Sequence, residues 1–300
     1  METSEKDIFL EKNALLKNIY KIKSVISYSD LSIVYLVDNQ KNNKVQVMKE
    51  YYPKLLAIRD LDQKVVVCRL PRLKEKFEQL KKAFSQEAEL LKILNHQHIV
   101  AYYDDFEENG TCYIVTEYCD GKQFDQFVKG DRKYILSSFF KKTILPLIDT
   151  LDYIHKSGII HRDIKPSNII IGQDGCPTII DFGSAINLNE TNSKTIFTTS
   201  GYSPIEFYSD CSEKGIYSDI YSLTATLYYF LTKSHPLDVS ERIIEDRIEP
   251  IRKYNRRLSP LVSNVIMWGL AVNYKKRCPS LKFIKIAIYV EYLILKLKKI

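Results

Sequence analysis

Two short clusters of polar residues could carry chemistry in this sequence. The first is His-Arg-Asp-Ile-Lys-Pro-Ser-Asn at residues 161–168, and the second is Asp-Phe-Gly at residues 181–183. Transfer of a phosphoryl group to an alcohol needs a carboxylate that accepts the hydroxyl proton, a cation against the phosphates, and oxygen ligands that hold Mg²⁺. The two clusters contain side chains of all these kinds: Asp163, Lys165, Asn168 and Asp181.

These clusters resemble the catalytic and metal-binding loops of eukaryotic-like (Hanks-type) protein kinases. The resemblance implies that Asp163 is the catalytic base, with Lys165 beside it to neutralise phosphate charge. It also implies that Asn168 and Asp181 hold Mg²⁺. A lysine two residues after the aspartate is similar to the serine/threonine branch of the family. We therefore expect ATP and Mg²⁺ as cofactors and a protein substrate that is phosphorylated on serine or threonine.

The same resemblance implies the rest of a nucleotide site. The stretch Val-Gln-Val-Met-Lys places Lys49 where the family's lysine holds the α and β phosphates, and Glu87 is its expected ion-pair partner. Backbone groups of Glu117 and Cys119 are expected to bind adenine, and Thr116 is expected to guard the back of the pocket. The other residues expected to bind the cofactor are Val34, Val47 and Ile170.

The loop that should cover the phosphates departs from the family pattern G-x-G-x-x-G-x-V. Residues 27–34 read Ser-Tyr-Ser-Asp-Leu-Ser-Ile-Val, so that Ser27, Ser29 and Ser32 occupy the glycine positions. Glycine reaches positive φ and lets backbone N–H groups approach phosphate oxygens closely. A side chain at Ser29 is therefore expected to crowd the phosphates. Because the charged groups of the transition state are all present, we expect a working enzyme with poorer ATP affinity.

Three alternative functions can be compared with a protein kinase on the basis of the sequence. A pseudokinase that binds partners without turning over ATP would explain the three serines. A small-molecule kinase on the same scaffold is disfavoured. Those families generally lack Lys165 at this spacing, the Ser-Pro-Ile-Glu segment at 203–206, and Arg277, which is placed to pair with Glu206. A pure binding module is disfavoured because the phosphate chemistry is so fully represented.

Regulation is expected to involve the segment 181–206. In the family, the arginine at the position of Arg162 pairs with a phosphate on this segment, and such a pair can order a loop. We hypothesise that autophosphorylation at Thr195 or Thr198 activates the enzyme, and that Thr199 has a structural role beside the substrate pocket.

A closer resemblance, to a bacterial subfamily of these kinases, is carried by three stretches. They are EYYPKLLAIRDLDQKVVV after Lys49, GYSPIEFY at 201–208, and SDIYSLTATLYYFLT at 218–232. The subfamily has a longer connection between the lysine strand and the next helix. Asp219, in the third stretch, matches the helix residue that braces the catalytic loop from below.

The coarse pattern indicates which elements position these residues. Alternating and β-branched residues over 18–50 predict β hairpins, and apolar residues at helical spacing over 71–95 predict a helix. From about residue 120 the pattern is helical. We expect an α+β, protein-kinase-like bilobal fold with a β-rich N-lobe that has one main helix, and a mainly helical C-lobe. The expected boundaries are an N-terminal extension at 1–17 and a kinase domain at 18–300, divided into an N-lobe at 18–117, a hinge at 117–121 and a C-lobe at 122–300.

The amino-acid composition limits the kinds of binding partner and the cellular compartment that are expected. The net charge is +7 over 300 residues, and the lysines and arginines are interspersed with carboxylates, which argues against nucleic-acid binding. The six cysteines show no metal or disulfide spacing, and the first residues lack the apolar core of a signal peptide, so a cytoplasmic protein is expected. The apolar and basic stretch 282–300 permits a membrane-surface helix, but the last helix of the C-lobe is favoured. The sequence does not determine the oligomeric state.

Overall fold

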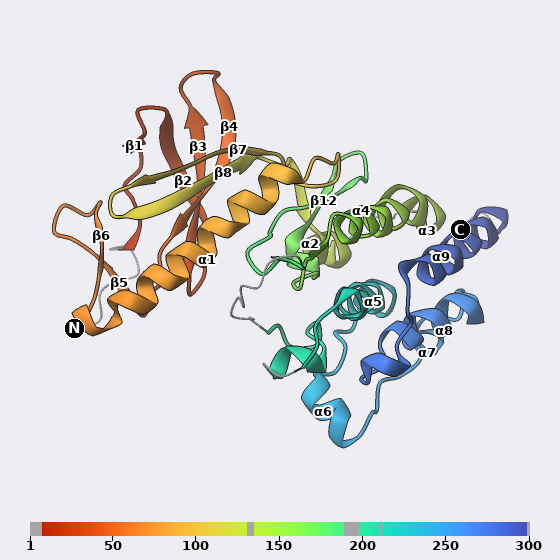
Figure 1. Cartoon of the computed structure of the whole chain (residues 1–300). Helices are drawn as coiled ribbons and strands as arrows, with labels where there is room; N and C mark the ends of the chain where they lie inside the picture. The colour runs from red at the N-terminus through yellow and green to blue at the C-terminus, as the bar shows by residue number, and fades with distance from the viewer. Residues whose placement is uncertain (1–7, 131–134, 189–197, 210–211, 299–300) are drawn as a thin grey trace. The chain divides into compact units, whose positions relative to one another are not determined.

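The structure is a computed structural model that describes residues 8–130, 135–188, 198–209 and 212–298. The chain divides into two compact units (Figure 1). The first unit contains Met1–Asn95 and Val100–Tyr118, and the second contains His96–Ile99 and Cys119–Ile300.

The short segment His96–Ile99 belongs to the second unit although residues on both sides of it belong to the first. Its backbone explains this assignment. The amide of Ile179 donates to the carbonyl of His98 at 2.9 Å, and Ile99 forms a parallel bridge with Ile179.

The first unit is built on a six-stranded antiparallel sheet with the order β1-β2-β3-β4-β8-β7. Its strands are β1 (Leu15–Leu16), β2 (Tyr20–Tyr28), β3 (Ser32–Asn39), β4 (Lys44–Tyr51), β7 (Tyr102–Glu108) and β8 (Thr111–Glu117). Strand β3 shows why the sequence forms a sheet: Ile33, Tyr35 and Val37 alternate with less buried residues, so one face packs into the core. The turn between β7 and β8 is Asn109–Gly110, and both residues have positive φ (52° and 72°), as a tight hairpin turn requires.

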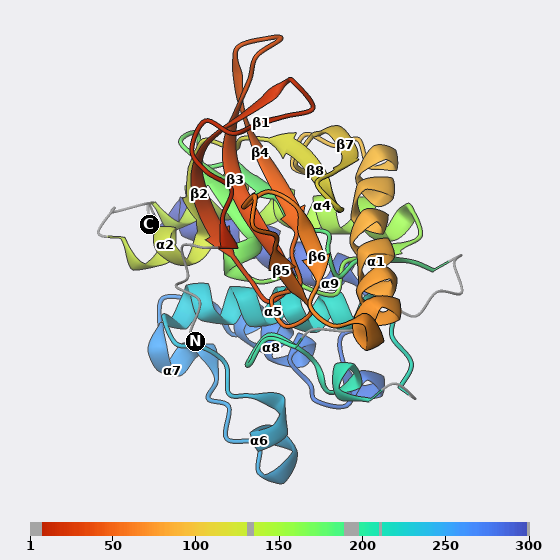
Figure 2. The same ribbon diagram turned by 90° about the vertical axis from the view of Figure 1, so that its left-hand side faces the viewer.

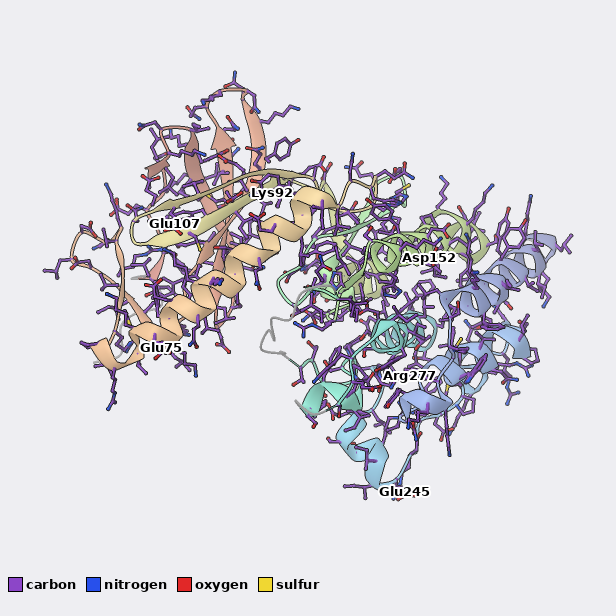
Figure 3. All side chains as sticks on the ribbon, in the orientation of Figure 1. Glu75, Lys92, Glu107, Asp152, Glu245 and Arg277 are labelled. Carbon is purple, nitrogen blue, oxygen red and sulfur yellow. The ribbon has the colours of Figure 1, made fainter. Side chains whose placement is uncertain are left out.

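The connection between β4 and the main helix contains a hairpin that the sequence pattern did not predict. This hairpin is β5 (Ala57–Arg59) paired with β6 (Val66–Cys68). A 3₁₀ turn at Pro71–Leu73 then leads into helix α1 (Lys74–Ile93), which contacts β7 and β8 and buries Phe77 and Leu91 (Figure 2). Figure 3 labels Glu75 and Lys92 near the two ends of α1.

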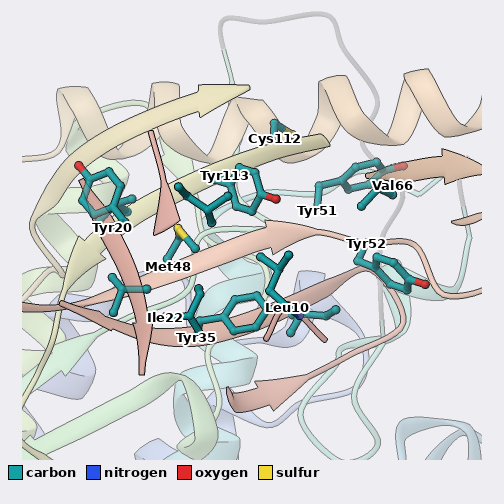
Figure 4. Close-up of a cluster of buried hydrophobic side chains, with 14 of the residues drawn as sticks. Leu10, Tyr20, Ile22, Tyr35, Met48, Tyr51, Tyr52, Val66, Cys112 and Tyr113 are labelled. Atoms are coloured by element: carbon teal, nitrogen blue, oxygen red, sulfur yellow. The ribbon is translucent and has the colours of Figure 1, made fainter. Parts of the chain in front are cut away.

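Large tyrosines fill much of the core of the first unit, together with aliphatic side chains (Figure 4). Their hydroxyls find partners inside it. The hydroxyl of Tyr51 donates to the carbonyl of Phe77 at 2.8 Å, and the ring of Phe77 lies 5.2 Å from that of Tyr51. A buried hydroxyl that keeps a hydrogen bond avoids the cost of desolvation without a partner.

A buried ion pair anchors the β5–β6 hairpin to the sheet. Glu50 on β4 is fully buried and accepts from Arg59 of β5. The hydroxyls of Tyr35 and Tyr113 also donate to Glu50, each at 2.9 Å. Burial raises the pKa of both tyrosines, so they remain protonated donors. Arg59 Nε donates to the carbonyl of Ile8 at 2.7 Å, and this contact ties the start of the described chain to the same cluster.

The second unit is mainly helical. Its helices are α2 (Phe124–Lys129), α3 (Leu136–Phe139), α4 (Leu145–Lys156), α5 (Ile216–Thr232), α6 (Val239–Ile244), α7 (Ile251–Tyr254), α8 (Pro260–Gly269) and α9 (Leu281–Leu297), with a π-helical turn at Phe140–Ile144 between α3 and α4. Its small sheets have the orders β12-β11-β9 and β10-β13. Their strands are β9 (Gly121–Gln123), β10 (Ile159–Ile160), β11 (Ile169–Gly172), β12 (Pro177–Ile179) and β13 (Ile186–Asn187).

Helix α5 lies at the centre of the second unit. From Ser218 to Thr232 each of its residues is buried, which fits a sequence that is apolar or small on every side. Helix α8 approaches α5 closely at Gly269, where an added Cβ would meet the Thr224 side chain at 2.3 Å. Glycine is therefore required there by packing rather than by backbone conformation.

The predicted α+β fold is confirmed, with a β-rich amino-terminal unit that has one main helix and a mainly helical carboxy-terminal unit. Among the residues that the structure describes, no helix combines the length and the apolar character needed to cross a membrane.

Candidate active site

The catalytic loop, residues 161–168, follows β10 and ends in a 3₁₀ turn at Pro166–Asn168. Its side chains converge on Asp163. Lys165 Nζ lies 2.9 Å from Asp163 Oδ2, and Asn168 Nδ2 donates to the same oxygen at 2.8 Å. Asn168 also donates to the backbone carbonyl of Asp163 at 2.9 Å, so the carboxylate is held in one orientation.

The other carboxylate oxygen of Asp163 is less engaged. The hydroxyl of Thr199 donates to Oδ1 at 3.4 Å, a long contact for an O–H donor. Thr199 also accepts from Lys165 Nζ at 3.0 Å, and its amide donates to the hydroxyl of Ser203 at 2.8 Å. The end of the segment 181–206 is therefore placed beside Asp163 by ordinary hydrogen bonds.

Asp219 on α5 holds the backbone of the catalytic loop. It is fully buried and accepts from the amides of His161 and Arg162 at 2.9 and 2.8 Å. His155 Nε2 lies 2.8 Å from the same carboxylate. Burial alone would favour the neutral acid, but the bonds from His155 and the backbone outweigh it and lower the pKa of Asp219. The predicted bracing contact from Asp219 to the loop is confirmed.

Arg162 combines an uncommon backbone conformation with a buried guanidinium group. Its φ is 66°, in the left-handed region, and its guanidinium is buried, with Nε donating to the carbonyl of Ser184 at 2.6 Å. Burial lowers the pKa of Arg162 to about 10. One terminal nitrogen, Nη2, has no hydrogen-bond partner in the described structure.

The hypothesised phosphorylation site Thr195 lies outside the described residues, whereas Thr198 is described and exposed.

The Asp-Phe-Gly cluster is brought to the catalytic loop by the β11–β12 hairpin. The amide of Ile180, beside Asp181, donates to the carbonyl of Asn168 at 3.1 Å. Phe182 is fully buried, and its ring lies 4.7 Å from that of His161. Asp181 and Asn168 thus lie on adjoining backbone segments, and their side chains offer the hard oxygen donors that Mg²⁺ prefers. The oxygen donors of Asn168 and Asp181 are therefore of the kind that suits the Mg²⁺ implied by the sequence.

Within the first unit, Lys49 and Glu87 form an ion pair. Strand β4 carries Lys49, helix α1 carries Glu87, and Nζ lies 2.8 Å from Oε2. Glu87 is only 3% exposed, so its carboxylate is held in place by packing. Lys49 pairs with Val34 across the β3–β4 ladder, and Val47 pairs with Thr116 across β4–β8. The predicted contact between Lys49 and Glu87 is confirmed.

The serine-substituted loop forms a compact turn between β2 and β3, which we call the serine turn (residues 27–32). The Ser29 amide donates to the carbonyl of Ser32 at 2.8 Å. The Ser29 hydroxyl accepts from the amides of Leu31 and Ser32 at 3.3 and 3.2 Å. No residue of this turn has positive φ. The turn therefore needs no glycine for its backbone conformation, and its own hydroxyl occupies two amides.

The ion pair between Glu206 and Arg277 supports the segment that ends near Thr199. Arg277 (labelled in Figure 3) contacts Glu206 through both terminal nitrogens, at 2.7 and 3.2 Å, and both side chains are buried. Ser218 adds a bond to Glu206 at 2.8 Å. This predicted pair is confirmed. Two further contacts, from His155 to Asp219 and from the Thr199 amide to the Ser203 hydroxyl, were not predicted from the sequence.

Comparisons with known proteins agree with this geometry. The family described as "Protein kinase domain" matches residues 54–286, and the chain therefore belongs to the protein kinase family. The matched range begins after Lys49, so the serine turn and the lysine strand lie outside it.

Bacterial serine/threonine kinases are among its relatives. The chain is 32% identical over 209 residues to "Serine/threonine-protein kinase PknB" of Mycolicibacterium smegmatis, covering 65% of this chain and 33% of that protein. It is 36% identical over 176 residues to "Serine/threonine-protein kinase D" of Synechocystis, covering 54% and 33%. The solved structure "PpkA-294 apo form" is 27% identical with a TM-score of 0.80, covering 94% of this chain and 99% of that one. The matches span about a third of the length of these curated relatives.

Proposed function

We propose that the protein is a bacterial serine/threonine protein kinase that transfers the γ-phosphoryl group of Mg·ATP to a protein hydroxyl. The observation that carries this proposal is the asymmetry of the Asp163 carboxylate. Oδ2 is paired with Lys165 and hydrogen-bonded by Asn168, whereas among the described residues Oδ1 has only the long contact from Thr199. Oδ1 is therefore the atom that accepts the proton of the attacking hydroxyl.

The nucleotide and metal roles belong to the same proposal. Lys49, fixed by Glu87, would bind the α and β phosphates, and the oxygens of Asn168 and Asp181 would hold Mg²⁺. The metal ion would supply positive charge beside the transferring group. Lys165 adds a cation beside the acceptor hydroxyl. The remaining residues proposed to bind ATP are Ser27, Ser29, Ser32, Val34, Val47, Thr116, Glu117, Cys119 and Ile170.

The alternative of an inactive scaffold is not favoured. It rested on the serines of residues 27–32, and these form a turn with ordinary φ values. Weaker ATP binding remains the expected consequence, because the Ser29 hydroxyl engages amides that a phosphate would otherwise accept from. We further propose a cytoplasmic location. Cys68, Cys112, Cys176 and Cys278 are thiols rather than members of disulfides, which suits a reducing compartment.

The decisive experiment compares the wild type with Asp163→Asn in incorporation of labelled phosphate from γ-labelled ATP. Substrates are a generic basic protein and, in parallel, a panel of amino- and hydroxyl-bearing metabolites. Loss of a general base predicts a rate lower by about 10²- to 10⁴-fold in the variant. The proposal fails if the two proteins label the basic protein equally, or if only the metabolites are phosphorylated.

A further inference from the structure

Helix α9 has two apolar faces, and only one of them is covered. The covered face packs on α3, α4 and α8 and comprises Leu281, Ile284, Ala287, Ile288, Tyr292 and Leu295. The opposite face carries apolar side chains spaced three or four residues apart, which we call the α9 stripe: Phe283, Ile286, Tyr289, Leu293 and Leu297. These side chains are between 40% and 85% exposed. A surface helix normally carries polar residues on this face.

Helix α8 extends the α9 stripe. The two helices are in contact at the carboxy-terminal end of the second unit (Figure 1). Trp268 of α8 is 39% exposed, and its ring lies 5.6 Å from that of Phe283. Trp268 and Tyr289 are the amphipathic aromatic residues that favour a membrane–water interface.

The surroundings of the stripe are strongly basic. Residues 251–300 contain twelve of the 44 lysines and arginines but one of the 37 carboxylates, whereas residues 1–250 contain 32 basic and 36 acidic residues. The interspersion of charges that holds for the rest of the chain therefore breaks down here. The one carboxylate, Glu291, is fully buried and accepts from the Ser259 amide, so it does not neutralise the surface.

Several of these cations are exposed on α9 or next to α8 and α9 in the chain. On α9 and directly after it they are Lys282, Lys285, Lys296 and Lys298, and before α8 they are Arg256 and Arg257. Lys285 forms an ion pair with Asp149 of α4, which reduces its contribution to the positive charge of this surface. Long lysine side chains can cover apolar surface with their stems and extend the charge outward.

We propose that the α9 stripe and its flanking cations dock the protein on an anionic lipid surface, with α9 lying in the plane of the interface. The apolar side chains enter the boundary between headgroups and acyl chains, and the cations contact lipid phosphates and carboxylates. A second copy of the chain fits this face poorly, because two surfaces of the same positive sign would be brought together. The proposal does not depend on phosphotransfer.

The test is flotation of the full chain with two kinds of vesicle. One contains phosphatidylcholine alone, and the other contains phosphatidylcholine with phosphatidylglycerol in a ratio of about 2:1, so that its surface potential is strongly negative. The chain should float with the anionic vesicles and stay unbound with the neutral ones. Binding should weaken as salt is raised, because screening reduces the attraction between exposed charges.

Two variants separate the apolar and the charged contributions. Ile286→Ser with Leu293→Ser removes two exposed side chains of the stripe, and Lys282→Gln with Lys298→Gln removes two cations. Each should reduce the bound fraction at least about tenfold, since apolar and electrostatic terms both contribute to interfacial binding. The matched control for the stripe variant is Leu61→Ser with Ile244→Ser, at residues 98% and 88% exposed outside α8 and α9. The matched control for the lysine variant is Lys41→Gln, on the β3–β4 turn, with Lys44→Gln, at the start of β4.

The controls should bind like the wild type, and thermal unfolding should show that each variant remains folded. The catalytically impaired Asp163→Asn should also float normally. The proposal is overturned if the wild type does not bind anionic vesicles at low salt, or if the stripe variant binds them undiminished. It is equally overturned if the wild type is a dimer that the stripe variant converts to a monomer while neither binds vesicles, because the face then serves self-association.

Discussion

The catalytic loop and the serine turn are both short polar segments, but they are held in different ways. In the catalytic loop, distant residues fix the polar groups: Asp219 holds the backbone and Thr199 reaches Asp163. In the serine turn, the side-chain hydrogen bonds are local and involve chiefly Ser29 and Ser32. The backbone of the turn also accepts from distant residues, because the amides of Tyr52 and Lys54 donate to the carbonyls of Leu31 and Asp30. The polar side chains of the catalytic loop therefore depend on the tertiary structure and tolerate little change, whereas the Ser29 side chain bonds only within its own turn and can be altered with small consequences for the fold.

The largest effect is expected for Asp219→Asn. The side-chain amide of the variant would present an N–H group to the backbone amides of His161 and Arg162, which now donate to a carboxylate. The substitution would also remove the negative charge that His155 faces. Breaking such a buried network should lower the free energy of unfolding by about 3 kcal/mol. Urea denaturation measures this change, and phosphate incorporation should fall as the loop loosens. Asp152→Asn on α4 is the control, because its ion pair with Lys156 is exposed to solvent and should contribute little to stability. Equal stability of both variants would show that Asp219 does not hold the catalytic loop.

A smaller effect is expected at the contact between Thr199 and Asp163. Thr199→Ala removes the hydroxyl that bonds Lys165 and Asp163, and the loss of hydrogen bonds of this kind predicts about a tenfold lower kcat/KM. Thr199→Ser retains the hydroxyl and should stay within about twofold of the wild type. If serine and alanine behave alike, the hydroxyl does not position these groups.

The serine turn should respond in the opposite direction. Ser29→Gly removes both the Cβ and the hydroxyl that occupies the amides of Leu31 and Ser32, so KM for ATP should fall by about three- to tenfold. Ser29→Ala frees the amides but keeps the Cβ, and it should give an intermediate KM. Steady-state kinetics at varied ATP would contradict this account if both variants raised KM.

The smallest effect concerns pH. Burial lowers the pKa of His161, whose ring faces Phe182 and which is influenced by Asp163, Asp181 and Asp219. A histidine that is harder to protonate in the folded state binds fewer protons than in the unfolded chain. The contribution of His161 to the free energy of unfolding is therefore fully present above the unfolded-state pKa of about 6.5. It decreases as the pH falls below that value, by up to about 1.4 kcal/mol per pH unit. Urea midpoints between pH 7.5 and 5.5 measure this slope, and His161→Phe should flatten it. An unchanged slope in that variant would assign the effect to another group.

The sequence by itself determined the chemistry and the order of the elements. The catalytic loop and the Asp-Phe-Gly cluster could be named because phosphoryl transfer restricts residue type and spacing. Lys49 with Glu87 and Glu206 with Arg277 could be named from the resemblance to the protein kinase family. The alternating pattern of β3 and the long apolar pattern of α5 likewise indicated their elements.

Only the tertiary structure decided what depends on residues far apart in the chain. The ion pair of Glu50 with Arg59, the bond from His155 to Asp219, and the bonds from the amides of Tyr52 and Lys54 to the serine turn have no local signal, because each joins different segments of the backbone. The sequence also presented the last helix and a membrane-surface helix as competing interpretations of residues 282–300. The structure shows that one face of α9 is buried in the second unit while the other remains apolar and exposed, since a helix presents different residues on its opposite sides.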